Sequence, residues 1–443
     1  MSAFPILSLA LALATTWGAV VVNGGETTGP AFAIPSPAYG NRPILGNTVP
    51  ALARNITPPN DPQAPGPESG TASPAADGAN GQGPAAAPDS DDEEELPQAA
   101  DPQKPRRELS EGMAALRDRV RRTLAAHRAQ PLSTAENTVT EVIYACRAFG
   151  CNTEVFEAVT LRTKLNGITC LTWNYPCGGF TPLTTSDGHI TGRIGYGYQE
   201  HPGELIATLA LARVAASYPL RVGDDVRTVA DLVEYEKLAC REGADKSLSM
   251  IGLMHYAGRD GSWQNRLGEE WSIERIVKEE LAKPVIGAPW GGTQRLMGLS
   301  YVVRRKEKRD GPMDDEFRRA QDYLVRFHDH AISLQNDDGS WSPHYLAAKG
   351  TSRDPGAVLA STGRILEWLA YSLPEERLEE PGVVRAVHYV NQVLSSGRYA
   401  PQNVKSLRTE EIGAVMHSLA ALRHYNDRYF KPADPPAEPS AAH

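Results

Sequence analysis

Apolar residues recur at intervals of three and four positions from Leu109 almost to the end of the chain. This spacing aligns apolar side chains along one face of a helix, so it is typical of amphipathic helices packed on a shared core. The pattern predicts helices over 110–129, 134–148, 153–165, 203–217, 228–240, 246–257, 272–282, 292–305, 313–335, 357–373, 382–396 and 409–428. Strand-like alternation is scarce, and only 189–198 is a good candidate for a short hairpin or loop. We therefore predict one all-α domain over residues 109–430.

Residues at the expected boundaries support several of these helices. Thr228 precedes an apolar segment and Asp231 follows three positions later, which predicts a capping box. Ser272 and Thr409 stand where a helix N-cap is expected, and acidic residues follow each of them. Glycine or proline stands between most of the later segments and is expected to end them.

The N-terminal quarter of the chain has a different character. Residues 3–22 carry no charge, which predicts a signal peptide or an N-terminal membrane anchor over 1–25. Residues 26–107 are rich in Pro, Gly, Ala and acidic residues, so we predict a long disordered linker there and a similar tail over 431–443. We therefore predict an exported protein of the periplasm or cell envelope. It would touch a membrane only through its first segment, if that segment is uncleaved.

Charge and cysteine content exclude several classes of protein. The net charge is −9 at pH 7, and a nucleic-acid partner is not expected because neutralising phosphates needs a surplus of Lys and Arg. The five cysteines include no Cys-x-x-Cys pair, and we predict neither a metal site nor a cofactor. The sequence allows a disulfide between Cys146 and Cys151 or between Cys170 and Cys177 and does not choose between these pairings. Because the number of cysteines is odd, at least one thiol stays unpaired.

One tetrapeptide occurs twice. Asp-Gly-Ser-Trp ends at Trp263 in the first copy, which includes Gly261, and at Trp341 in the second. The second copy has a longer pattern, because Gln335 and Gly339 precede Trp341 in the order Gln-x-x-x-Gly-x-Trp. Repetition at fixed structural positions predicts a repeat architecture.

Gln335, Gly339 and Trp341 resemble the Gln-Trp repeat of squalene-hopene cyclases and related α/α toroids. In that family the Gln caps a helix end and the Trp packs on the next turn. The copy with Gly261 and Trp263 lacks the Gln and is a degenerate match. The resemblance implies an α/α toroid, in which a ring of inner helices is surrounded by a ring of outer helices.

Longer segments resemble an uncharacterised planctomycete family of exported proteins that have this toroid. The segments that carry the resemblance are 173–179, 197–202, 270–275, 291–301, 335–341 and 362–368. This family has no established activity, so the resemblance implies a fold and a location and does not imply a reaction.

The predicted domain lacks the sequence motifs that mark the known reactions of toroid proteins. Residues 109–430 contain no Asp-x-Asp-Asp motif for cyclisation, no Asp-x-Cys zinc motif of prenyltransferases and no Cys-Gly-Glu-Gln thioester motif. The irregular segment 173–204 is the best place for a reaction, with Cys177 as a nucleophile, His201 as a base and Glu200 nearby as catalytic candidates. The alternative is structural, with a tight turn at Cys177 and a helix cap at His201.

Three tryptophans and one arginine are candidates for ligand binding. Trp271, Trp290 and Trp341 could line an aromatic pocket and Arg295 could turn inward, although tryptophans at helix ends are more often part of a core. Whether the protein is an enzyme stays open. The first hypothesis is an envelope protein that binds an unidentified ligand or protein partner or acts as a scaffold. The alternative is an enzyme that uses the toroid mouth, either a polysaccharide lyase or hydrolase or an isoprenoid-handling protein.

Overall fold

The computed structural model describes residues 108–157, 163–257, 261–309, 313 and 315–430. The expected signal or anchor, the linker and the tail lie outside the described residues. The described residues all belong to one compact unit, Ser90–His443. They form twelve α-helices and a few short strands, so the predicted all-α class is confirmed. None of these helices is both long and apolar enough to cross a membrane.

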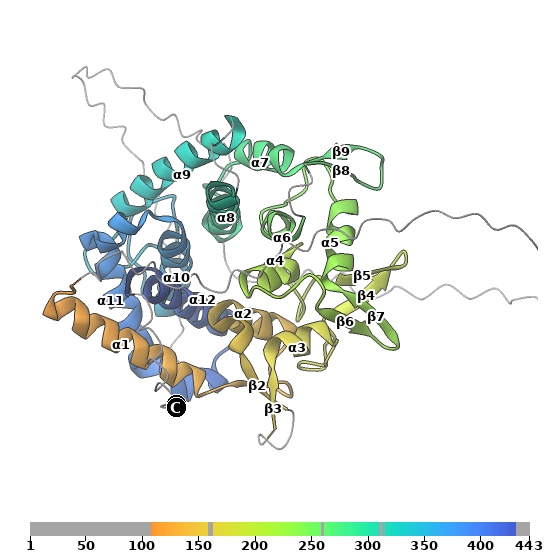
Figure 1. The fold of residues 1–443 in the computed structure, drawn as a ribbon. Helices are drawn as coiled ribbons and strands as arrows, with labels where there is room; N and C mark the ends of the chain where they lie inside the picture. The colour runs from red at the N-terminus through yellow and green to blue at the C-terminus, as the bar shows by residue number, and fades with distance from the viewer. Residues whose placement is uncertain (1–107, 158–162, 258–260, 310–312, 314, 431–443) are drawn as a thin grey trace, which may run out of the picture. The chain divides into compact units, whose positions relative to one another are not determined.

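Six helices, which we call the central helices, contact one another in a closed cycle. They are α2 (Val139–Phe149), α4 (Glu204–Leu211), α6 (Ser249–Tyr256), α8 (Thr293–Arg309), α10 (Pro355–Ser372) and α12 (Thr409–Tyr425). Each contacts the next in chain order, and α12 contacts α2 (Figure 1). The two ends of the domain are therefore neighbours in space.

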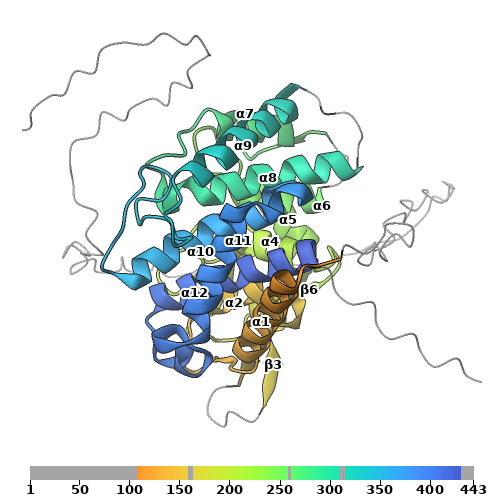
Figure 2. The ribbon, with the colours of Figure 1, turned by 90° about the vertical axis from the view of Figure 1, so that its left-hand side faces the viewer.

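The other six helices pack against this cycle from outside. They are α1 (Glu111–Arg128), α3 (Gly167–Thr172), α5 (Val229–Leu238), α7 (Ile273–Leu281), α9 (Asp315–Ser333) and α11 (Pro381–Ser395). Contacts join α3 to α2, α5 to α4 and α6, α7 to α6, and α9 to α8. Figure 2 shows α1 and α11 on the side of α12 and α10 that faces the viewer, and all four are in contact.

The two sets of helices differ in burial as their sequences require. All 11 residues of α2 are buried, and α12 is buried along almost its whole length. In α9, by contrast, the buried residues recur at three- and four-residue spacing, with charged residues between them. A helix covered on all sides tolerates apolar residues all round, whereas an outer helix needs one apolar stripe.

Small residues let neighbouring central helices approach closely. A Cβ atom on Gly363 of α10 would lie 2.3 Å from Oγ of Ser418 on α12. A Cβ atom on Gly252 of α6 would lie 2.5 Å from Cγ1 of Ile206 on α4. Real Cβ atoms do not approach other atoms so closely, so glycine at these two positions sets the spacing of the helices.

The predicted helix over 153–165 is wrong. The structure has β2 (Glu154–Phe156) paired antiparallel to β3 (Lys164–Asn166), and β2 also pairs parallel to β1 (Leu132–Ser133). Val155 is fully buried while Glu154 is exposed, so burial alternates from one residue to the next. Tertiary pairing with β1 therefore outweighs a weak helical pattern.

The described part of the helical unit also contains three β-hairpins, each with a loop of two or more residues. β4 (Leu183–Ser186) pairs with β5 (His189–Gly192), β6 (Pro219–Val222) with β7 (Asp225–Thr228), and β8 (Trp263–Gln264) with β9 (Glu270–Trp271). The hairpin expected at 189–198 is thus shifted towards the N-terminus. The helix expected over 203–217 ends early, at Leu211, where Arg213 takes a left-handed φ of 57° and the chain turns into β6.

Two of the three predicted helix starts are confirmed. Thr228 and Asp231 form the capping box of α5, and the Ser272 side chain accepts a hydrogen bond from the Arg275 amide at the start of α7. Thr409 is not an N-cap. It is the first residue of α12, and its hydroxyl donates a hydrogen bond to Glu141 of α2 at 2.7 Å. The local cap lies one residue earlier, where the Arg408 backbone N–H donates to the Glu411 carboxylate at 3.2 Å.

The segment from Gln335 to Trp341 joins two helix ends. The Gln335 amide donates to the carbonyls of Gly339 at 3.0 Å and of Gly382, in the first turn of α11, at 2.9 Å. The Trp341 indole N–H donates to the Ala331 carbonyl of α9 at 2.7 Å, and its side chain is buried. Trp263, in the other copy of the tetrapeptide, is only partly buried and donates to Lys237 of α5. The two copies therefore have different environments.

Candidate functional site

Buried polar side chains project from four of the central helices. They are Tyr144 and Arg147 of α2, Glu204 of α4, Arg364 and Glu367 of α10, and His417 of α12, and we call them the central polar cluster. The pairs on α2 and α10 are each three residues apart, so each pair lies on one helix face. Such a concentration of buried charge inside an apolar helical unit needs a physical or functional reason.

Arg147 binds both carboxylates of the cluster. Its guanidinium lies 3.3 Å from Glu367 and 4.0 Å from Glu204. Burial acts to raise the pKa of Glu367, but His417 and Arg147 outweigh it and lower that pKa well below its usual range. Glu367 is therefore ionised at neutral pH. For Glu204 burial dominates and raises the pKa.

His417 is oriented by Glu367. Its Nδ1 lies 2.5 Å from a Glu367 carboxylate oxygen. Burial, with Arg364 adding to it, lowers the pKa of His417 to about 3, so the ring is neutral at pH 7. An ionised carboxylate can only accept a hydrogen bond, so the proton of the neutral ring is placed on Nδ1. The Nε2 atom then has a free lone pair, and within the described residues it makes no hydrogen bond.

Arg364 differs from Arg147 in having no carboxylate beside it. In the described part of the chain it forms no ion pair, and its buried Nε atom has no hydrogen-bond partner. The guanidinium carbon lies 4.3 Å from the ring centre of Trp290. Burial opposes its charge, but nearby Tyr144 and Tyr345, with Glu200, raise its pKa on balance. Arg364 is thus a buried cation stacked on an aromatic ring.

A small cavity lies among these groups. Its volume is about 10 Å³, which is room for roughly one water molecule. It is lined by Arg147, Arg364, Glu367 and His417 of the cluster and by Thr293, Gln294 and Met297 of α8. We call it the central cavity. Anything larger than water can enter only if a side chain moves.

Trp290 partly covers Arg364 from a strained turn. Trp290 has a left-handed φ of 51° within the turn Pro289–Gly292, and Tyr345, which packs against this turn, has a φ of 53°. A Cβ atom on Gly291 would lie 2.2 Å from Cβ of Tyr345, so only glycine fits there. Non-glycine residues in this region are energetically unfavourable and cluster at ligand sites and switch regions.

His201 and Glu200 lie close to this turn. The Trp290 indole N–H donates to Nε2 of His201 at 2.9 Å. Burial lowers the pKa of His201, so the neutral ring can accept that bond at pH 7. The Glu200 backbone N–H donates to the Glu204 carboxylate at 2.8 Å, while the Glu200 side chain is exposed. Three candidates from the sequence, His201, Glu200 and Trp290, are thus brought to the edge of the cluster.

Cys177, the nucleophile candidate, lies elsewhere. Its thiol is buried and donates to the Tyr175 carbonyl at 3.5 Å, and among the described residues no contact joins it to His201. Burial, and then the neighbouring Cys170 and Cys146, raise its pKa, which makes a thiolate unfavourable. All five cysteines have free thiols in the structure. The structure does not assemble the Cys–His pair.

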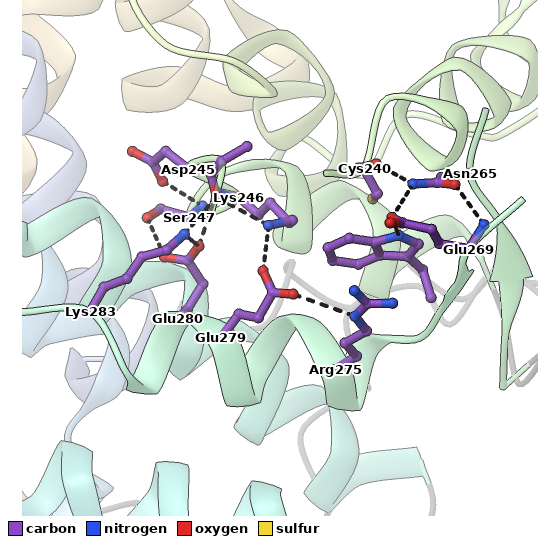
Figure 3. Close-up of polar contacts among 12 residues, drawn as sticks. Cys240, Asp245, Lys246, Ser247, Asn265, Glu269, Arg275, Glu279, Glu280 and Lys283 are labelled. Carbon is purple, nitrogen blue, oxygen red and sulfur yellow. Dashed lines mark hydrogen bonds and ion pairs between the residues drawn. The ribbon is translucent and has the colours of Figure 1, made fainter. Parts of the chain in front are cut away.

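Trp271 and Arg295 belong to a second buried network, between α6 and α7. Figure 3 shows Lys246 and Arg275 beside the carboxylate of Glu279. The same two cations lie 4.7 Å and 4.0 Å from the centre of the Trp271 ring. Trp271 is fully buried, and its ring already contacts both cations. The ring is therefore not available to bind a ligand.

Arg295 serves the same network. Its Nε donates to the fully buried Glu280 carboxylate at 2.9 Å, and Lys283 binds the other oxygen of that carboxylate at 2.6 Å. Figure 3 shows Glu280 with Lys283 and Ser247 around it. Arg295 therefore links α8 to α7. Trp341 is also structural, in the turn described above.

Four residues of the cluster were not singled out from the sequence as site candidates, namely Tyr144, Arg147, Arg364 and His417. A usable signal existed, because Arg147 and Glu367 interrupt segments that are apolar all round. A helix of that kind is buried on every side, so a charge within it must point inward. Within the described residues no three His, Cys, Asp or Glu side chains are grouped so as to hold a metal ion.

No family model, curated protein or solved structure matches this chain. Its function therefore has to be argued from the site itself.

Proposed function

We propose that residues 109–430 form an α/α toroid that binds a ligand at the central cavity, and that the protein is exported to the cell envelope. The closed contact cycle of the central helices, with six further helices outside it, supports the toroid. Residues 1–25 would direct export, and residues 26–107 would be a linker that holds the toroid away from a membrane or wall.

The observation that carries the binding proposal is Arg364. Arg364 is buried, forms no ion pair in the described part of the chain and has an Nε atom without a hydrogen-bond partner, and a buried donor left unpaired is a cost to folding. Residues of this kind persist where they serve binding, because function and stability are often in conflict. The polar cavity beside Arg364 and the strained Trp290 turn above it fit a binding site.

Trp290 fluorescence tests the proposal with the full-length protein. A panel of acidic, neutral and basic oligosaccharides and an envelope metabolite extract would be titrated into the wild type, Trp290→Phe and Trp263→Phe. We expect a saturable fluorescence change in the wild type and in Trp263→Phe that is absent in Trp290→Phe. Trp263 is a matched control because its indole N–H also has a hydrogen bond, outside the cluster. The proposal fails if every ligand that binds leaves the Trp290 signal unchanged.

An enzyme is the second candidate, and His417 favours it. A neutral His whose Nδ1–H is held by a carboxylate presents its Nε2 lone pair as a general base. His417 lines the central cavity with other polar groups, and two carboxylates meet at Arg147. The charged lining suits a polar substrate, such as that of a polysaccharide lyase or hydrolase, better than an isoprenoid chain.

The enzyme candidate is tested by assaying polysaccharides for new reducing ends and for unsaturated products. Activity that falls at least 100-fold in His417→Gln, with ligand binding retained, would support it. Binding without any turnover by the wild type would leave the binding protein as the better description.

A further inference from the structure

We infer that the ligand of the central cavity carries an oxyanion, such as a carboxylate, sulfate or phosphate, which binds the guanidinium of Arg364, and that the Trp290 indole is the lid over this site. This inference rests on the proposed binding function and specifies the chemistry of the ligand.

In the central polar cluster Arg147 forms ion pairs and Arg364 does not. Both buried carboxylates, Glu204 and Glu367, are within ion-pair distance of Arg147. Glu367 also holds His417 with its second oxygen. Arg364 sits one helical turn before Glu367 on α10, and Glu200 and Glu367 favour its charge, but it forms no ion pair with a carboxylate of the described residues. A bound anion would supply the missing partner.

The groups around Arg364 suit an oxyanion. A guanidinium presents a planar set of N–H donors that matches two oxygens of a carboxylate, sulfate or phosphate. The Nε–H of Arg364 is buried and has no partner in the described structure. The first residues of α8, Thr293 and Gln294, line the same cavity, and the N-terminus of a helix favours negative charge.

Trp290 packs against Arg364, which lines the central cavity. The central cavity holds about 10 Å³, too little for an oxyanion beside Arg364 unless a side chain moves. The Trp290 side chain is only partly buried, and its indole N–H makes one hydrogen bond, to His201. Its backbone is already in a strained conformation. Displacement of the indole therefore breaks one hydrogen bond and one stacking contact, while an anion replaces the stacking on Arg364.

The test uses thermal denaturation and calorimetric titration of the full-length protein at constant ionic strength. The probes are sodium acetate, sulfate, phosphate and trigalacturonate, with sodium chloride and neutral maltotriose for comparison. The variants are Arg364→Gln and, as a control, Arg353→Gln, which removes the same charge from an exposed position just before α10. We expect saturable binding of at least one oxyanion by the wild type and Arg353→Gln, weakened at least 10-fold in Arg364→Gln.

A further variant, Trp290→Ala, tests the lid. We expect it to bind the same oxyanion faster and at least as tightly, because no indole has to be displaced. Slower association in Trp290→Ala would overturn the lid. Binding of trigalacturonate but not of phosphate or sulfate would identify an acidic sugar as the source of the oxyanion, and binding of phosphate or sulfate alone would identify a small or phosphorylated ligand.

Equal oxyanion affinity in the wild type and Arg364→Gln, or no oxyanion binding at all, would overturn the inference. A neutral ligand that still changes the Trp290 fluorescence would then leave the proposed binding function standing. The failure of one proposal is thus distinct from the failure of the other.

Discussion

At the scale of single residues, the two buried arginines of the cluster illustrate how the same type of side chain can have opposite effects on stability in two environments. Arg147 is the partner of two buried carboxylates, whereas Arg364 has none. Replacing both by the same apolar residue of similar length therefore gives opposite expectations.

Arg147→Met is expected to lower the free energy of unfolding by about 3–5 kcal/mol, because Glu367 and Glu204 remain buried without their cation. Chemical denaturation with urea, followed by circular dichroism, measures the change. A loss below about 1 kcal/mol would mean that water or another cation replaces Arg147.

Arg364→Met is expected to leave the free energy of unfolding unchanged or to raise it by up to about 2 kcal/mol, since a buried charge without a partner is removed. The methionine can still pack on Trp290. The same urea denaturation experiment measures this change in the free energy of unfolding. A loss of several kcal/mol would show that Arg364 is a structural residue and would weaken the binding proposal.

At the scale of structural elements, the two copies of Asp-Gly-Ser-Trp are a matched pair for a stability experiment. Gly339 has a φ of 93°, and a Cβ atom there would lie 2.5 Å from the backbone oxygen of Arg385 in α11. Gly261 has no atom within 4 Å of the equivalent position. The glycine of the tetrapeptide is therefore tightly constrained at position 339 and has open space around it at position 261.

Gly339→Ala is expected to destabilise the protein by about 2–4 kcal/mol, through strain at positive φ and displacement of α11. Gly261→Ala is expected to change stability by less than about 0.5 kcal/mol. Thermal melts of both variants beside the wild type test this. Equal effects at the two positions would contradict the different environments that we describe.

At the scale of the whole molecule, buried histidines make stability depend on pH. Burial lowers the pKa of His328 and His255 to about 4 and that of His424 to about 3. In the unfolded chain each titrates near 6.5, so between these values the unfolded state binds more protons than the folded state. Stability from these groups is complete above about pH 6.5 and is lost as the pH falls towards 4.

We therefore expect the urea midpoint to drop steadily from pH 7 to pH 4.5. The buried His328 alone is worth on the order of 3 kcal/mol. Glu236 and Glu204 act in the opposite direction, because burial raises their pKa values, that of Glu236 to about 6. His417, whose pKa burial lowers to about 3, adds to the three histidines and keeps them in the majority. A urea midpoint that stays constant over this range would contradict the prediction. His328→Asn is a suitable comparison, since it should flatten the pH dependence.

The amino-acid sequence by itself determined the helical class and most helix positions. Helical periodicity and caps are local properties, and the capping box at Thr228 and the N-cap at Ser272 need only neighbours a few residues away. The sequence also directed attention to His201, Glu200 and Trp290. Where partners are distant in the chain, as for β1 and β2 or for Thr409 and Glu141, local reasoning was wrong.

Only the tertiary structure decided which charged residues meet. Arg147, Glu204, Glu367 and His417 come from four helices spread over most of the domain, and their convergence depends on α12 closing against α2. It also distinguished Arg364, which forms no ion pair with a described carboxylate, from Arg295, which looks similar in sequence but is bound by Glu280. Coulombic pairing acts through space over a few ångströms, so it is invisible to any pattern along the chain.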